Sequence, residues 1–163
     1  MNKRKIATAI FALLIVLTVA FIFSNSLKSK EESAKDSELV AGVLGPMLEW
    51  IFGGKIENVG YITRKLAHFA EFSLLGIFTA GFVISLDAKR IWSFCGYALL
   101  SCLIIAVSDE FIQGFVDRGS AVGDVLIDFF GAVFGFFAVT GVVCLMFWKK
   151  NRKSIIQKRE EVL

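Results

Sequence analysis

The sequence predicts an all-α membrane protein, a four-transmembrane-helix bundle with an outer amphipathic segment between the first and second spans. The 163-residue chain is 56% hydrophobic and contains 17 Phe against a single Pro, whereas soluble domains usually contain about 45–50% apolar residues. These apolar residues form four blocks with charged residues between them. The blocks leave little chain for a separate soluble domain, so we expect one membrane domain over residues 6–148.

The first predicted span covers residues 6–23 and follows a short basic terminus, residues 1–5. A helix of this length is about 27 Å long, which is close to the thickness of the hydrocarbon core. The alternative is a cleavable signal peptide. We favour a retained anchor because the apolar run exceeds the usual core of about 7–15 residues.

The segment from Ser24 to Tyr61 is polar and then amphipathic. Its apolar residues recur at helical spacing, at Leu39, Val40, Val43, Leu44, Met47, Leu48 and Ile51. Pro46 predicts a break in this helix, and Gly60 predicts a loop. We expect the segment to lie on the membrane surface or to cap the bundle, with Trp50 and Tyr61 at the interface.

Three further spans are predicted over residues 66–86, 91–108 and 122–148. Only four residues separate the second and third spans, so these spans form an antiparallel hairpin. Residues 149–163 form a basic tail that we expect to fray. The three cysteines, Cys95, Cys102 and Cys144, lie inside apolar blocks, which predicts packing rather than a disulfide or a thiolate metal site.

The distribution of basic residues predicts that both termini are cytoplasmic. With that orientation, eleven of the eighteen Lys and Arg residues fall on the inner side: Lys3, Arg4, Lys5, Lys89, Arg90, Lys149, Lys150, Arg152, Lys153, Lys158 and Arg159. Because topology explains these clusters, we predict no nucleic-acid partner.

Polar residues from three different spans fall at one depth near the outer face. His68 lies 19 residues before Asp87 and Asp109 lies 19 residues after Arg90, so both are about 28 Å from the inner turn. Asp128 reaches a similar level on the fourth span. The residues of this zone are Arg64, Lys65, His68, Glu71, Asp109, Glu110, Gln113, Arg118, Asp124 and Asp128.

Charged side chains at membrane depth are costly, so they usually face the interior, pair and mark a functional site. The alternative is that they end helices and reach back to water, which is as good an explanation for Arg64 and Lys65. His68, Asp109 and Asp128 are candidate ligands of a divalent metal, although no compact metal-binding signature is present. Arg64, Lys65 and Arg118 can instead hold a phosphate or a carboxylate.

Gly131 and Gly135 form a Gly-x-x-x-Gly motif in the last span. Such a motif permits close contact between helices. We expect that contact within the bundle, and a homo-oligomer through the same glycines is the alternative.

Three segments resemble the VanZ-like family of bacterial integral membrane proteins: Arg64-Lys-Leu-Ala-His-Phe-Ala-Glu-Phe72, Asp109-Glu-Phe-Ile-Gln-Gly-Phe-Val-Asp-Arg118 and Gly123-Asp-Val-Leu-Ile-Asp-Phe-Phe-Gly131. The polar positions that recur in that family fall here on Lys65, His68, Glu71, Asp109, Glu110, Gln113, Arg118, Asp124 and Asp128.

The resemblance implies a bacterial plasma-membrane protein related to an accessory factor for teicoplanin resistance. We expect it to contact membrane lipids and to bind or modify an outer-leaflet envelope molecule, such as a lipid-linked precursor or a lipidated glycopeptide. One alternative is a membrane hydrolase or transferase that uses the same acids, with or without a metal. The other is a structural or interaction subunit of an envelope complex.

Overall fold

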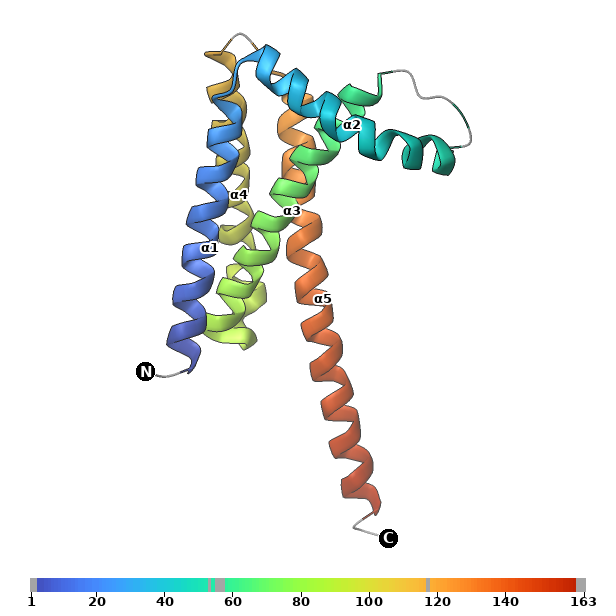
Figure 1. The fold of residues 1–163 in the computed structure, drawn as a ribbon. Helices are drawn as coiled ribbons and strands as arrows, with labels where there is room; N and C mark the ends of the chain where they lie inside the picture. The colour runs from blue at the N-terminus through green and yellow to red at the C-terminus, as the bar shows by residue number, and fades with distance from the viewer. Residues whose placement is uncertain (1–2, 53, 55–57, 117, 161–163) are drawn as a thin grey trace.

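The computed structural model describes residues 3–52, 54, 58–116 and 118–160, and every regular element within these ranges is a helix (Figure 1). This confirms the all-α prediction. The elements are α1 (Lys3–Ser26), α2 (Lys30–Phe52), α3 (Val59–Asp87), the short 3₁₀ helix η1 (Ala88–Arg90), α4 (Ile91–Gly114) and α5 (Val122–Glu160). Of these, α1, α3, α4 and the part of α5 up to Lys150 are long and apolar enough to cross a membrane.

The four long helices lie side by side, and α2 crosses them at one end (Figure 1). The chain ends lie at the opposite end from α2. Helix α3 is central, since it contacts α1, α2, α4 and α5. At the end away from α2, α1 is tied to α3 by a hydrogen bond of 2.9 Å between Thr8 Oγ1 and Ser85 Oγ.

All four spans are longer as helices than the apolar blocks alone predicted, and the extensions of α3 and α4 carry site residues. Helix α3 begins at Val59, well before Leu66, and α4 continues past Ser108 to Gly114. The added turns contain Arg64, Lys65 and Asp109, so these residues lie in regular helix. The prediction of a loop at Gly60 was wrong for the same reason, because Gly60 lies in the first turn of α3.

The expected break at Pro46 does not occur, because α2 runs unbroken through it. Pro46 and Gly42 are exposed, so water can solvate the Gly42 carbonyl that has no N–H donor at Pro46. The start of α2 is a capping box: Ser29 Oγ accepts a hydrogen bond from the Glu32 backbone N–H at 3.2 Å, and Glu32 Oε2 accepts one from the Ser29 backbone N–H at 2.9 Å.

Glycines bring α3 and α5 into backbone contact. A Cβ at Gly135 would overlap the Ser73 carbonyl of α3, and one at Gly76 would overlap the Ala132 carbonyl of α5. Gly131 meets the Phe69 carbonyl in the same way. The motif therefore serves the contact within the bundle, as expected. Its use between two copies is untested, and both motif glycines are already buried here.

The buried core follows α3 down the bundle. Its upper half contains Ile22 of α1, Phe72 and Leu75 of α3, and Cys102 and Ala106 of α4. The outward sides of the helices carry large apolar residues that are more than one third exposed, as lipid-facing surfaces require. The three cysteines are free thiols within the helices.

Helix α5 continues through Glu160, so the expectation that the chain frays after Lys149 was wrong. It extends well beyond the other helices at the end that carries the termini (Figure 1). Residues 1–2 of the predicted N-terminus and residues 161–163 of the predicted tail lie outside the described residues.

Candidate functional site

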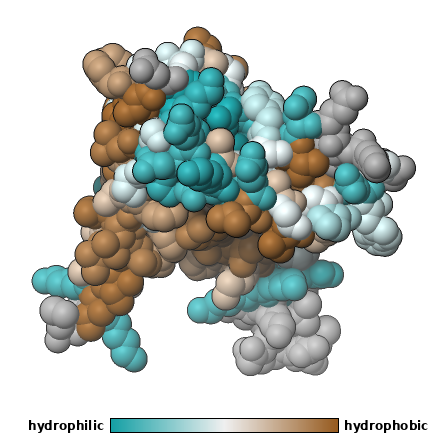
Figure 2. Space-filling view, turned by 45° about the horizontal axis from the view of Figure 1, so that its top comes forward, coloured by the Kyte–Doolittle hydropathy of each residue, from teal (hydrophilic) through white to brown (hydrophobic). Residues whose placement is uncertain are grey.

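The candidate site lies at the end of the bundle that carries α2. Figure 2 shows hydrophilic surface gathered over this end, above a flank that is largely hydrophobic. The polar side chains beneath it come from α1, α3, α4, α5 and the loop before α5. Each of the four membrane helices therefore contributes side chains to the site.

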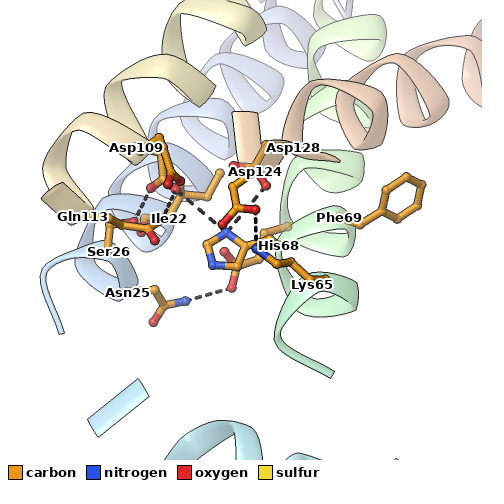
Figure 3. A network of polar contacts seen from close by, with 12 residues as sticks. Ile22, Asn25, Ser26, Lys65, His68, Phe69, Asp109, Gln113, Asp124 and Asp128 are labelled. Atoms are coloured by element: carbon orange, nitrogen blue, oxygen red, sulfur yellow. Dashed lines mark hydrogen bonds and ion pairs between the residues drawn. The ribbon is translucent and has the colours of Figure 1, made fainter. Parts of the chain in front are cut away.

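At its centre, the imidazole of His68 faces two carboxylates from neighbouring helices (Figure 3). His68 Nδ1 lies 3.6 Å from Asp128 Oδ1 and 3.9 Å from Asp109 Oδ2. Asp109 is 0% exposed and Asp128 is 1% exposed. We refer to His68, Asp109 and Asp128 as the triad. Residue counts from the inner turn for His68 and Asp109, and from Trp148 for Asp128, predict one level for these side chains, and the structure brings them together.

Asp109 is held in place by hydrogen bonds from two helices. Ser26 Oγ donates to Asp109 Oδ1 from the end of α1, and Gln113 Nε2 donates to Oδ2 at 2.8 Å from the next turn of α4. Both donors are buried. Asp128 differs, because neither of its carboxylate oxygens has a hydrogen-bond partner among the described residues.

The remaining acids and bases surround the triad. Lys65 and Asp124 form an ion pair between α3 and α5. Glu110 Oε1 accepts a hydrogen bond of 2.7 Å from the Ala121 backbone N–H, so this carboxylate holds the loop that leads into α5. Its other oxygen has no partner within the described residues.

Asn25 joins two predicted site residues on the other side of His68. Its amide Nδ2 donates to Glu71 Oε1 at 2.9 Å, and its backbone carbonyl accepts a hydrogen bond of 3.0 Å from Arg118 Nη1. Burial of the Arg118 guanidinium lowers its pKa below the ordinary value, and the neighbouring charge of Arg64 lowers it further. Arg118 thus brings a partly desolvated positive charge to the site.

All nine residues predicted for the site lie in this region, but they form separate groups. Sequence reasoning missed Asn25 and Ser26, which were assigned to the loop after the first span. They lie in the last turn of α1, and their contacts are with Glu71 and Asp109. The only signal for them was a polar Ser-Asn-Ser run at the end of an apolar block, which is a common sequence.

Two cavities meet at His68. The smaller, of about 20 Å³, is lined by Arg64, Lys65, His68, Gln113, Arg118, Gly119, Asp124, Ile127 and Asp128. This volume holds about one water-sized group. The larger, of about 240 Å³, lies beneath α2 and is lined by Phe21, Asn25, Lys28, Ser33, Asp36, Ser37, Val40, Thr63, Arg64, Ala67, His68, Glu71 and Arg118. We call the larger one the polar pocket.

An apolar groove of about 310 Å³ joins the polar pocket from the side. It runs between α1 and α3 and is lined by Leu14, Leu17, Thr18, Phe21, Ala70, Glu71 and Leu74. Phe21 and Glu71 line both the groove and the polar pocket. We call it the lipid-facing groove, because exposed apolar residues of α1 and α3 form its walls.

The arrangement supports two kinds of chemistry. An imidazole and two carboxylates can transfer protons or bind a cation. Arg64 and Arg118 can bind an anionic group in the polar pocket, where Lys28 is already paired with Asp36 at 2.7 Å. Both kinds of chemistry are available to one ligand, since His68 lines both cavities.

A family model described as VanZ/LLP1 matches residues 11–150 of the chain. No curated protein and no solved structure matches it. The match covers α1 from residue 11 onward, α3, α4, the membrane-spanning part of α5 and every residue of the triad. The chain therefore belongs to the VanZ/LLP1 family and is a multi-pass membrane protein, as its polar motifs and apolar blocks had predicted.

Proposed function

We propose that this protein binds an anionic, lipid-linked molecule of the outer leaflet of a bacterial plasma membrane. The molecule is a lipid-linked envelope precursor or a lipid-bearing glycopeptide such as teicoplanin. The acyl or prenyl chain lies in the lipid-facing groove, and the headgroup lies in the polar pocket beneath α2. The residues proposed to serve binding are Lys65, His68, Glu71, Asp109, Glu110, Gln113, Arg118, Asp124 and Asp128.

The observation that carries this proposal is the continuity of groove and pocket. Phe21 and Glu71 line both, so an apolar chain between α1 and α3 leads directly to a headgroup among cations. Lys28, Arg64 and Arg118 line the pocket. Guanidinium groups form paired hydrogen bonds with phosphate or carboxylate oxygens, which favours an anionic headgroup.

The orientation follows from the basic residues and from the position of the chain ends. The termini lie at the end away from α2 (Figure 1), and that end also carries Arg90 and Lys149. Basic residues favour the cytoplasmic side. We therefore infer that both termini are cytoplasmic and that the polar pocket opens toward the outer leaflet.

Helix α2 has the surface expected of a helix at the headgroup level. Leu39 and Val43 are 73% and 78% exposed, although they are apolar, and Trp50 is 83% exposed. An amphipathic helix in the interface buries such residues among lipids. In this proposal α2 lies over the pocket and contributes Ser33, Asp36, Ser37 and Val40 to its lining.

A second candidate function is hydrolysis or group transfer on the bound lipid. The observation that favours it is the position of the triad at the junction of the two cavities. An imidazole between two carboxylates can act as a general base toward a headgroup in the polar pocket. Release of inorganic phosphate from a polyprenyl phosphate by purified protein would establish this activity.

Lipid exchange into purified protein tests the binding proposal. The protein is reconstituted in phosphatidylcholine nanodiscs and titrated with phosphatidylglycerol or a polyprenyl phosphate, and bound lipid is counted by native mass spectrometry. We expect both anionic lipids to bind and Arg64→Gln to weaken their binding about tenfold or more. The control is Lys35→Gln, because Lys35 is exposed on α2 and lies outside the pocket lining.

A second pair of variants tests the lipid-facing groove. Leu17 lines the groove, whereas Leu13, one turn earlier on α1, is equally lipid-facing and lies outside the lining. Leu17→Trp should block the groove and reduce binding, and Leu13→Trp should not. Anionic lipids that bind no better than phosphatidylcholine would contradict the proposal.

A cellular test separates ligand binding from a structural role. Alanine at His68, Asp109 or Asp128 is introduced and the abundance of the protein is measured alongside sensitivity to teicoplanin. Changed sensitivity at unchanged abundance supports the binding site. Unchanged sensitivity at unchanged abundance contradicts it, and reduced abundance with intact lipid binding favours the structural subunit.

A further inference from the structure

The triad has the composition and spacing of a metal site. One ligand atom from each of His68, Asp109 and Asp128 lies within 4.8 Å of the other two. We propose that these three side chains bind one divalent transition-metal ion, zinc or manganese, at the junction of the two cavities. This inference does not depend on the proposed lipid ligand.

The distances fit an ion at the centre of the triad. Ligands about 2.0–2.2 Å from a zinc ion lie about 3.3 Å or slightly more apart in a tetrahedral site. The two imidazole-to-carboxylate distances are 3.6 and 3.9 Å. The third distance, between the two carboxylates, is at most 4.8 Å, so metal binding requires the carboxylates to move closer together. Figure 3 shows both carboxylates on the same side of the imidazole ring.

Asp128 gives an independent reason to place a cation here. Its side chain is 1% exposed, and neither oxygen has a hydrogen-bond donor within the described residues. His68 Nδ1 lies 3.6 Å from Asp128 Oδ1, which is too long for a hydrogen bond. A buried carboxylate without donors carries a large desolvation cost, and a metal ion removes that cost directly.

The surroundings of Asp109 resemble the support that metal ligands usually have. Ser26 and Gln113 donate hydrogen bonds to its two oxygens and fix the orientation of the carboxylate. Such outer hydrogen bonds keep a ligand in position and tune its basicity. Ser26 comes from α1, so the metal site ties the first helix to the other three.

The nearby positive charges do not occupy the triad. Lys65 is paired with Asp124, and Arg118 Nη1 is bonded to the carbonyl of Asn25. Two buried carboxylates therefore face one imidazole, and a divalent ion balances their charge. The mixed nitrogen and oxygen ligands favour zinc or manganese over calcium and magnesium, which prefer oxygen ligands alone.

Three protein ligands leave at least one coordination position open. The small cavity of about 20 Å³ is lined by His68 and Asp128 and has room for one further ligand atom or water. A catalytic zinc site has the same plan of three protein ligands and one open position. The lining cations Arg64 and Arg118 make an anionic oxygen the natural occupant of that position.

Metal binding is tested directly on the full-length protein in detergent. The protein is treated with a chelator, exchanged into metal-free buffer, incubated with Zn²⁺ or Mn²⁺ and passed through a desalting column. We expect about one ion per chain for wild type, and a loss of affinity of about 100-fold or more for Asp128→Asn. The control is Asp87→Asn, since Asp87 ends α3 at the opposite end of the bundle and lies outside the triad and both cavities.

A cysteine exchange distinguishes a metal ligand from a residue that only supports the fold. Asp128→Cys is loaded with Co²⁺, and a thiolate ligand produces an intense near-ultraviolet charge-transfer band. Asp87→Cys should produce none, and the three native cysteines serve as a shared background in both variants. Size-exclusion profiles and thermal unfolding confirm that each variant is folded.

The proposal is overturned if wild type retains neither ion, or if Asp128→Asn and Asp109→Asn retain the metal as wild type does. It is also overturned if Asp128→Cys and Asp87→Cys give the same cobalt spectrum. Because no lipid is added, failure here leaves the lipid-binding proposal standing, and failure of lipid binding leaves the metal site standing.

Discussion

The imidazole of His68 on α3 and the carboxylate of Asp128 on α5 lie 3.6 Å apart across the glycine-lined contact between these two helices. Gly131 and Gly135, which follow Asp128 on α5, let the two backbones touch. The position of the polar site therefore depends on small residues that have no polar chemistry of their own. The contribution of these glycines to the fold can therefore be tested by substitution.

Gly135→Val should destabilise the bundle by about 1–3 kcal/mol or more, because the added carbons would overlap the backbone of Ser73. The measurement is the temperature at which detergent-solubilised protein loses its monodisperse size-exclusion peak. Gly141→Val on the same helix is the matched control, since nothing lies within 4 Å of a Cβ at Gly141. Equal effects of the two substitutions would contradict the packing role.

Ser26→Ala should destabilise the protein by about 1–3 kcal/mol, because it removes a donor from the buried carboxylate of Asp109. If the triad holds a metal, the same change should also weaken metal affinity about 10- to 100-fold. Ser24→Ala is the control, because Ser24 is exposed and its hydroxyl only returns to the carbonyl of Phe21. Thermal unfolding and metal retention are measured on both variants, and indistinguishable results would remove Ser26 from the site.

The cap of α2 should weaken in acid. The pKa of Glu32 is lowered below its ordinary value of 4.5, first by the backbone N–H of Ser29 and then by the Ser29 hydroxyl. A carboxylate with a lowered folded-state pKa stabilises the fold above the ordinary value, and this contribution is lost as pH falls through the folded-state value. Hydrogen exchange of the first turn of α2 should therefore be faster in Glu32→Ala than in wild type near neutral pH.

Below the folded-state pKa of Glu32, the difference between Glu32→Ala and wild type should disappear. Glu31→Ala is the control, because Glu31 is equally exposed but is not the partner of Ser29. A difference that persists in acid would show that the substitution acts through helix propensity rather than through the cap.

Cysteine labelling tests the orientation. Ser120→Cys lies in the exposed loop next to the polar site, whereas Ala88→Cys lies in η1 at the opposite end. A membrane-impermeant maleimide should label Ser120→Cys in intact cells and should label Ala88→Cys only after the cells are permeabilised. The parental chain gives the background from its native cysteines. The reverse pattern would place the pocket on the cytoplasmic side.

Helical periodicity and the inner turn were enough to predict the level of His68, Asp109 and Asp128. Depth along a helix is fixed by its rise per residue, so residue counts from a short loop translate directly into height. Because exposing a charged side chain to lipid is energetically costly, such residues face the interior of the helix bundle. The four spans and the triad could be predicted for these physical reasons.

The contacts of Asn25, Ser26 and Arg118 could not be predicted in the same way. They depend on how far α1 extends past its apolar block and on the path of the loop before α5, and neither has a periodic signal. The break predicted at Pro46 was wrong because water can solvate the carbonyl left without a donor at an exposed site, and the exposure of α2 has no signal at Pro46 itself. The capping box of Ser29 and Glu32 follows a recognisable sequence pattern, which predicts the start of α2 at this point of the chain.

The central position of α3 has a consequence for biogenesis. Membrane helices are made in chain order, so α3 enters the bilayer before α4 and α5 have been synthesised. Until then His68 has neither Asp109 nor Asp128 beside it, and Asn25 is the only described hydrogen-bonding partner of Glu71 already present. The part of α3 with Lys65, His68 and Glu71 therefore enters the membrane before most of its polar partners have been synthesised. The polar site is complete only after α5 has been inserted.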